Sequence, residues 1–143
     1  MADDDEDDQL LLREAFRKVG PSGDLRVVND GEELLTCLRH TVEEGGAACL
    51  PDLILLDLNM PRKDGRETLR ELKADPALRS IPVVIFTTSA AADDITTSYD
   101  LGGNSYIRKP DSFAGLVEVV RMLDRYWFDT VRLPGHALDR SVA

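Results

Sequence analysis

The chain has 143 residues, 43% of them hydrophobic and 31% charged, and a formal net charge of −10. These values fit one globular domain and exclude both a second domain and an intrinsically disordered chain. No apolar stretch approaches the roughly 20 residues of a membrane-spanning helix, and the acidic balance argues against partners that bind through phosphate, such as nucleic acid and anionic lipid.

The first half of the chain alternates between helical and strand-like patterns. Residues 7–20 carry apolar side chains at helical spacing and end in a glycine, which predicts an amphipathic helix. The β-branched residues 25–29 predict a short strand, and residues 30–40 begin with the pattern of a helix capping box. A loop is expected over residues 43–51, and the apolar run 52–58 is typical of a strand buried on both faces.

The second half continues the alternation. Residues 65–75 predict a helix, residues 81–88 a second buried strand, and residues 91–103 a weaker helix that ends at two glycines. Residues 105–110 predict a short strand, and residues 112–128 predict a long amphipathic helix that begins with a serine cap. Strands that alternate with helices predict an α/β fold with an open parallel sheet, right-handed crossovers and helices on both faces.

Polar side chains stand where the predicted strands end. Asp57, Thr87 and Lys109 close three strands, and the acid pair Asp3 and Asp4 precedes the first helix. The carboxyl ends of parallel strands meet at one edge of the sheet, where such proteins bind ligands. Carboxylates without thiol or imidazole suit a hard cation, above all Mg²⁺. A carboxylate can also be a nucleophile that becomes an aspartyl phosphate, with a lysine and a hydroxyl to hold the phosphoryl oxygens.

These residues stand within motifs that resemble one family. The motifs are the pair Asp3-Asp4, the stretch LLDLNMPRKDG around Asp57, the hydroxyl of Thr87, Tyr106, and the pair Lys109-Pro110. In this order they resemble the CheY-like receiver domain of two-component response regulators, which implies a flavodoxin-like, doubly wound parallel sheet with strand order 2-1-3-4-5. The receiver domain is placed at residues 1–127, and residues 128–143 form a C-terminal tail available for a dimer or partner contact.

The resemblance implies a set of residues for phosphorylation and metal binding. Asp57 is implied as the phosphoacceptor for a histidine kinase. Asp4, Asp57 and the backbone carbonyl of Asn59 would bind Mg²⁺ directly, and Asp3 would act through water.

The resemblance also implies a switch. Lys109 would pair with the phosphoryl oxygens, and its peptide bond to Pro110 is expected to be cis. Thr87 would follow the phosphoryl group inward and let Tyr106 turn from an exposed to a buried rotamer.

Structural interpretations of the same residues remain. Asp57 could cap a turn, Thr87 could be an ordinary strand residue, and Tyr106 could be plain packing. Residues 6–8, which are all acidic, are interpreted as the solvated start of the first helix, where the helix dipole favours acids, and not as ligands. Thr88 is expected to shape access to the site.

The leading functional hypothesis is a single-domain response regulator, which is a phosphorylatable switch and not an enzyme. The expected partner is a sensor histidine kinase, of the phytochrome type because the region from Thr87 to Pro110 and the aromatic residues 125–134 are most similar to stand-alone receivers that serve such kinases. A phosphotransfer protein and a second copy of the chain are further candidate partners. Cys37 and Cys49 lack zinc-ligand spacing and follow no signal peptide, which favours free thiols in the cytoplasm.

Two other functions stay open. An Asp-nucleophile phosphohydrolase also forms an aspartyl phosphate, but it needs a second Asp where this chain has Asn59. A pseudo-receiver would only scaffold other proteins.

The beginning of the chain departs from the family pattern. Only Met1 and Ala2 precede the acid pair, where the family carries four or five apolar residues of a central strand. We expect the natural chain to begin upstream of Met1, with the first strand truncated here. Otherwise another segment or a shifted strand must fill the gap in the sheet.

Overall fold

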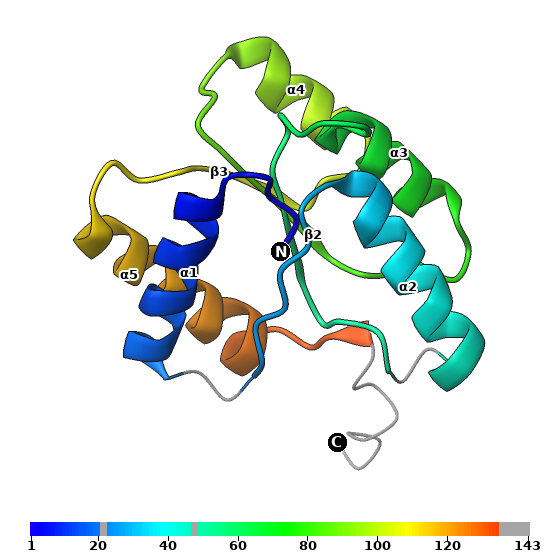
Figure 1. Ribbon diagram of the computed structural model, residues 1–143, viewed down its shortest axis with the longest axis horizontal. Helices are drawn as coiled ribbons and strands as arrows, with labels where there is room; N and C mark the ends of the chain where they lie inside the picture. The colour runs from blue at the N-terminus through cyan, green and yellow to red at the C-terminus, as the bar shows by residue number, and fades with distance from the viewer. Residues whose placement is uncertain (21–22, 47–48, 135–143) are drawn as a thin grey trace.

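Three parallel strands form the centre of the computed structural model of this protein, which describes residues 1–20, 23–46 and 49–134 (Figure 1). The strands are β1 (Ile54–Leu56), β2 (Val83–Thr87) and β3 (Ser105–Arg108), in the order β1-β2-β3. Every residue of β1 and β2 is buried, as in a parallel sheet with helices on both faces. The central strands predicted from the apolar runs are confirmed.

The sheet continues beyond β1 through two single-residue bridges. Ala2 pairs in parallel with both Leu56 and Val28, and the backbone N–H of Asp57 donates to the carbonyl of Ala2 at 3.1 Å. The order of neighbours from Val28 to β3 is therefore the predicted 2-1-3-4-5, with the single bridge residue Ala2 in the place of the first strand. The strand predicted over residues 25–29 was wrong in extent, because Val28 alone of this segment forms a bridge, and it does so with Ala2. The expected upstream start stays a prediction.

Within the described residues, five α-helices connect and flank the strands. They are α1 (Glu6–Val19), α2 (Gly31–Gly45), α3 (Gly65–Ala74), α4 (Ala92–Asp100) and α5 (Phe113–Leu123). The expected loop over residues 43–51 was wrong at its start, because α2 continues to Gly45 and ends only at Gly46, whose φ of 70° stops the helix. The other predicted helices are confirmed within a few residues.

The last helix extends past the predicted domain end. A π-helix, η2 (Asp124–Thr130), follows α5 directly, and its Trp127 packs against the core. The predicted tail thus begins inside a helix, and its residues 135–143 lie outside the described residues. A dimer or partner contact in this tail stays a prediction.

Helices cover both faces of the sheet. Helices α2 and α3 lie on one side of the strands, and α1 and α5 lie on the other (Figure 1). Leu56 belongs to one hydrophobic cluster with Leu35 and Leu69, whereas its neighbour Leu55 belongs to a second cluster with Leu12. Because both faces are filled with apolar side chains, polar chemistry is left to the edges of the sheet.

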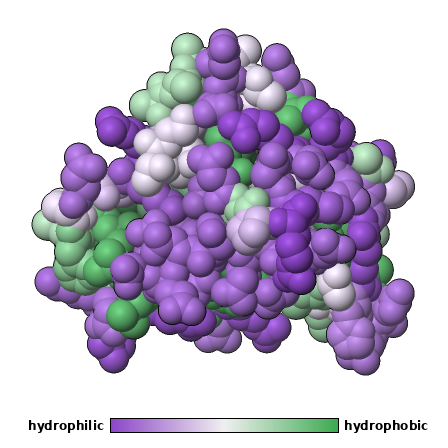
Figure 2. Space-filling model, turned by 45° about the horizontal axis from the view of Figure 1, so that its top comes forward, coloured by the Kyte–Doolittle hydropathy of each residue, from purple (hydrophilic) through white to green (hydrophobic). Residues whose placement is uncertain are grey.

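The surface carries mainly polar side chains. Figure 2, in which the top of Figure 1 is turned toward the viewer, shows a face that is mostly hydrophilic. Within the described ranges, no helix is long and apolar enough to cross a membrane.

Substitution of Gly65 by alanine should destabilise the fold. A Cβ on Gly65 would lie 2.2 Å from the carbonyl oxygen of Asp57 and 2.7 Å from Cα of Leu58, and backbone atoms cannot move aside easily. We expect Gly65→Ala to lower the free energy of unfolding by about 3 kcal/mol, measured by urea denaturation with far-UV circular dichroism. Gly23→Ala is the matched control, because a Cβ there meets nothing within 4 Å. Equal stability of the two variants would contradict this account.

Candidate functional site

The polar residues predicted at the strand ends meet at one edge of the sheet. Asp3 follows the bridge residue Ala2, Asp57 follows β1, and Lys109 follows β3. Carboxylate oxygens of Asp3, Asp4 and Asp57 all lie within 4.8 Å of one another. Segments far apart in the sequence therefore build one acidic cluster.

Lys109 ties this cluster together. Its Nζ donates to Asp3 Oδ2 at 2.7 Å, to Asp8 Oδ2 at 2.7 Å and to Asp57 Oδ2 at 3.0 Å. Burial by itself would lower the pKa of Lys109, but its hydrogen bonds to the three carboxylates raise the pKa above the usual value for lysine. The ammonium group therefore stays charged at physiological pH.

Asp3 is the most deeply buried acid of the cluster. Its residue is 0% exposed, and burial raises the pKa of its carboxyl to about 6, against the opposing effect of the hydrogen bonds from Lys109 and from the backbone N–H of Asp5. Gln9 Nε2 donates to the Asp3 carbonyl at 2.5 Å and to Asn29 Oδ1 at 3.0 Å. These contacts fix the segment that carries the acid pair.

An open cavity of about 550 Å³ lies over the cluster. Its lining residues are Asp4, Asp5, Glu6, Asp7, Asp8, Asp57, Asn59, Thr88 and Lys109. Thr88 thus borders the cavity, and its expected role in shaping access stays a prediction. Nearly all the lining side chains end in oxygen, which is the donor type that a hard divalent cation takes.

Thr87 and Tyr106 do not line the cavity. Thr87 is fully buried, and its Oγ1 is the one buried side-chain polar atom without a hydrogen-bond partner in the described part of the chain. Tyr106 is half-buried in β3, and its hydroxyl donates to the carbonyl of Ser89 at 2.8 Å. An unpaired buried hydroxyl is costly, so Thr87 is suited to gain a partner when a ligand enters.

The expected cis bond before Pro110 was wrong. Among the described residues no peptide bond is cis. The trans form is the more stable one for a proline peptide, and with it Lys109 already reaches all three carboxylates.

Asp8 is the residue of this candidate site that the sequence interpretation missed. It was expected to be part of a solvated helix start, but its carboxylate contacts Lys109 as closely as that of Asp3. The sequence offered one signal, since Asp8 lies in the first turn of α1, which begins only three residues after Asp3. Two other acids of this turn, Glu6 and Asp7, line the cavity without contacting Lys109.

Comparison with known proteins gives a consistent result. The sequence profile of one family, described as the response regulator receiver domain, matches residues 1–121. The probable methanogenesis regulatory protein FilR2 of Methanothrix harundinacea is 39% identical over 96% of this chain and 87% of its own length.

Two cyanobacterial proteins are similar in both sequence and structure. Response regulator Rcp1 of Synechocystis is 37% identical over 94% of this chain and 90% of its own length. The crystal structure of its Mn²⁺-bound form has a TM-score of 0.79 and covers 93% of this chain and 95% of that chain. The phosphorylated cyanobacterial phytochrome response regulator RcpA is 42% identical, with a TM-score of 0.81, over 93% of this chain and 94% of that chain.

The pH dependence of stability should report the burial of Asp3. Because the pKa of Asp3 is raised from 3.8 to about 6 in the folded state, the folded protein keeps a proton that the unfolded chain loses between these values. Asp3 therefore favours the folded state below about pH 4, and this contribution is lost as the pH rises through about 6. Between pH 4 and pH 7, in the presence of a chelator, we expect the free energy of unfolding of Asp3→Asn to rise above that of the wild type by up to about 3 kcal/mol. Urea denaturation at several pH values measures this difference, and a difference that does not change with pH would contradict it.

Proposed function

This chain belongs to the response regulator receiver domain family of two-component signalling proteins, and we propose that Asp57 is its phosphoacceptor. The observation that carries the proposal is the position of the Asp57 carboxylate, which borders the open cavity and accepts a hydrogen bond from Lys109 Nζ at 3.0 Å. The fold leaves the carboxylate reachable, although the residue is only 8% exposed. Members of the family act as phosphoacceptor switches.

The proposed reaction is an in-line transfer from a phosphohistidine of a sensor kinase. A carboxylate oxygen of Asp57 forms a bond to phosphorus while the phosphorus–nitrogen bond breaks, and its electron pair stays on the imidazole that leaves. Lys109 has its ammonium next to Asp57 and can turn toward the phosphoryl oxygens, whose charge it balances. The chain's part in the reaction is thus to supply the nucleophile and a fixed positive charge.

The acidic cluster fits a divalent cation, and we propose Mg²⁺ as the ion that it binds. Asp4, Asp57 and the carbonyl of Asn59 would hold the ion directly, with Asp3 acting through water. Support comes from the oxygen atoms of Asp3, Asp4 and Asp57, which lie within 4.8 Å of one another. When bound, the ion would neutralise charge on the phosphoryl oxygens.

We propose that Thr87 and Tyr106 respond to phosphorylation. The buried hydroxyl of Thr87 lacks a partner and can donate to a phosphoryl oxygen. To make this bond, Thr87 would move toward the phosphoryl group. This movement at the end of β2 would release space for the ring of Tyr106, which is half-buried next to Ser89. The surface around β3 and α4 would change with it.

The proposed partner is a sensor histidine kinase of the phytochrome type. This rests on the similarity to RcpA, a phytochrome response regulator by its description. A phosphotransfer protein and a second copy of the chain stay candidate partners.

Phosphorylation can be tested with a small donor. After incubation with Mg²⁺ and acetyl phosphate, intact mass spectrometry should detect one phosphoryl group on the wild type and none on Asp57→Asn. Glu6→Gln is the matched control, because Glu6 lines the same cavity outside the acidic cluster, and it should keep the adduct.

Two results would contradict the proposal. Absence of an adduct with every donor would favour a scaffold protein. Steady release of phosphate over many turnovers would favour a phosphohydrolase.

Metal binding should depend on Asp4 more than on Asp7. Both carboxylates line the cavity, but only Asp4 belongs to the cluster. We expect Asp4→Asn to weaken Mg²⁺ binding about tenfold or more, which is at least about 1.4 kcal/mol, and Asp7→Asn to weaken it much less. Isothermal titration calorimetry measures both. Equal losses would mean that the ion responds only to the overall negative field.

A further inference from the structure

The loop that follows Asp57 and leads into α3, residues 58–64, is fastened to the start of α2. Arg62 Nε and Nη2 donate to Asp30 Oδ2 at 2.8 and 2.5 Å. Asp30 is the N-cap of α2, and its other oxygen, Oδ1, accepts from the backbone N–H of Glu33 at 2.8 Å. One carboxylate therefore both begins a helix and holds the loop that follows Asp57.

Arg62 has a backbone conformation that needs support. Its φ is 60°, and it is the one non-glycine residue with a positive φ in the ranges that the structure describes. A residue with a Cβ is strained there unless contacts elsewhere hold it. The hydrogen bonds to Asp30 are such contacts, because bonds between a guanidinium and a carboxylate are among the stronger ones in proteins.

Asp30 in turn depends on Arg62. Asp30 is 2% exposed, and burial by itself raises the pKa of its carboxyl. Hydrogen bonds from the backbone N–H of Glu33 and from Arg62 outweigh this effect and hold the pKa below its usual value. The Arg62 side chain is 62% exposed, so the pair contributes little to the overall stability of the fold, and its effect is to hold the loop in place.

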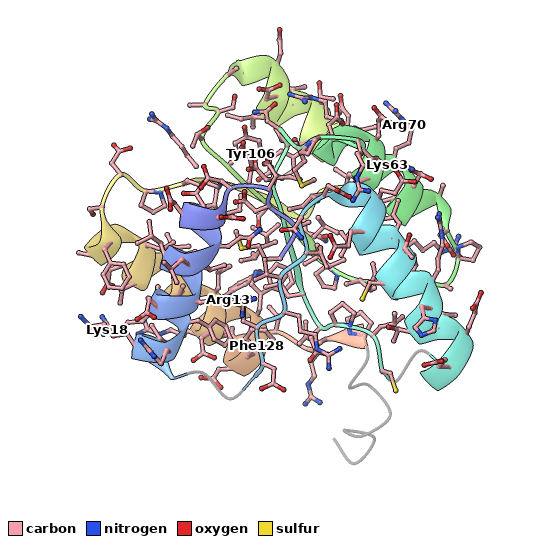
Figure 3. All side chains as sticks on the ribbon, viewed as in Figure 1. Arg13, Lys18, Lys63, Arg70, Tyr106 and Phe128 are labelled. Carbon is pink, nitrogen blue, oxygen red and sulfur yellow. The ribbon has the colours of Figure 1, made fainter. Side chains whose placement is uncertain are left out.

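The backbone joins the same two segments. The N–H of Gly31 donates to the carbonyl of Lys63 at 3.3 Å, and a Cβ on Gly31 would lie 2.8 Å from that carbonyl oxygen and 1.8 Å from Thr68 Oγ1. Figure 3 shows Lys63 near the start of α2 and beside α3, where its Nζ pairs with Glu71. The loop is therefore seated directly against the first turn of α2.

We propose that the Arg62–Asp30 pair is a positioning clamp for the cation site. It holds the loop so that the carbonyl of Asn59 and the carboxylate of Asp57 face the same ion, and the inference rests on the metal site proposed above. Neither Arg62 nor Asp30 lines the cavity, so the pair acts through the loop and does not touch the ion.

The charge and the clamp predict effects of opposite sign. A guanidinium repels a nearby cation, so the charge of Arg62 alone weakens metal binding, and its removal should leave affinity unchanged or increase it. The clamp organises the ligands, so its removal should weaken binding. A variant of Arg62 therefore separates the two effects.

The decisive variant is Arg62→Gly, because glycine adopts a φ of 60° without strain. We expect the Mg²⁺ dissociation constant of the full chain to rise about tenfold, as for loss of other groups that orient metal ligands, while the thermal midpoint changes little. Isothermal titration calorimetry and a thermal melt with a chelator measure the two quantities. Unchanged or tighter Mg²⁺ binding would overturn the clamp.

Lys63→Ala is the matched control. It removes one positive charge from the neighbouring position of the same loop and leaves Arg62 and Asp30 in place. We expect Mg²⁺ affinity within about twofold of the wild type, because the Lys63 side chain pairs with Glu71 of α3 and not with the N-cap of α2. A loss equal to that of Arg62→Gly would overturn the assignment, since any loosening of the loop would then suffice.

Two further variants complete the test. Asp30→Asn added to Arg62→Gly should cost little further affinity if both residues act as one pair, and two independent losses would overturn the clamp. Arg62→Ala keeps the strain without the clamp and should lose affinity as Arg62→Gly does. If this variant fails to fold, Arg62→Gly still decides.

Failure of the proposed function gives a different result. In that case the wild type itself would bind no Mg²⁺, and both the metal site and the clamp would be rejected. Wild-type binding that persists undiminished in Arg62→Gly would overturn the clamp alone.

Discussion

The shared hydrogen bonds of Lys109 are the interaction on which the site depends. Carboxylates of Asp3, Asp4 and Asp57 lie within 4.8 Å of one another, and like charges at this separation repel strongly in a partly buried site. One ammonium group offsets part of this repulsion by bonding to Asp3, Asp8 and Asp57 together. Because these residues come from the start of the chain, the first helix and the end of β1, Lys109 also joins segments that are distant in sequence.

This balance makes the site responsive to a change of charge. The cluster keeps more negative than positive charge even with Lys109 in place, which favours entry of a divalent cation through the open cavity. A phosphoryl group on Asp57 would add negative charge and offer Lys109 a new acceptor. The same residue that stabilises the resting arrangement is therefore the one whose contacts have to change, which is a common basis for a two-state switch.

Much of the site could be predicted from the sequence because of one geometric rule. In a parallel sheet, residues that follow successive strands meet at one edge, so Asp57 and Lys109 could be brought together without any knowledge of side-chain contacts. This rule applies only to residues at the ends of strands and does not predict contacts made by helices and loops. Asp8 was missed because acids in a first helical turn are usually solvated, and the Arg62–Asp30 pair was missed because no periodic pattern relates a loop residue to a helix cap. The strand over residues 25–29 failed because its length depends on the neighbour and not on its own β-branched residues.

The helices around the site differ in how their first turns are held, and this difference indicates which segment would respond to a change at Asp57. Four of the five α-helices have a side-chain cap at their start, whereas α4, which begins after Ala91, has none. The segment before α4 follows Thr87, whose hydroxyl is unpaired, and it is held by the bond from Tyr106 to Ser89 and by contacts of Asp94. By contrast, α1 is tied to the site through Asp8, and α2 through Asp30. Asp94 of α4 also pairs with Arg66 of α3, so what distinguishes α4 is its uncapped start. A conformational response to phosphorylation would therefore begin most easily between Thr87 and the first residues of α4.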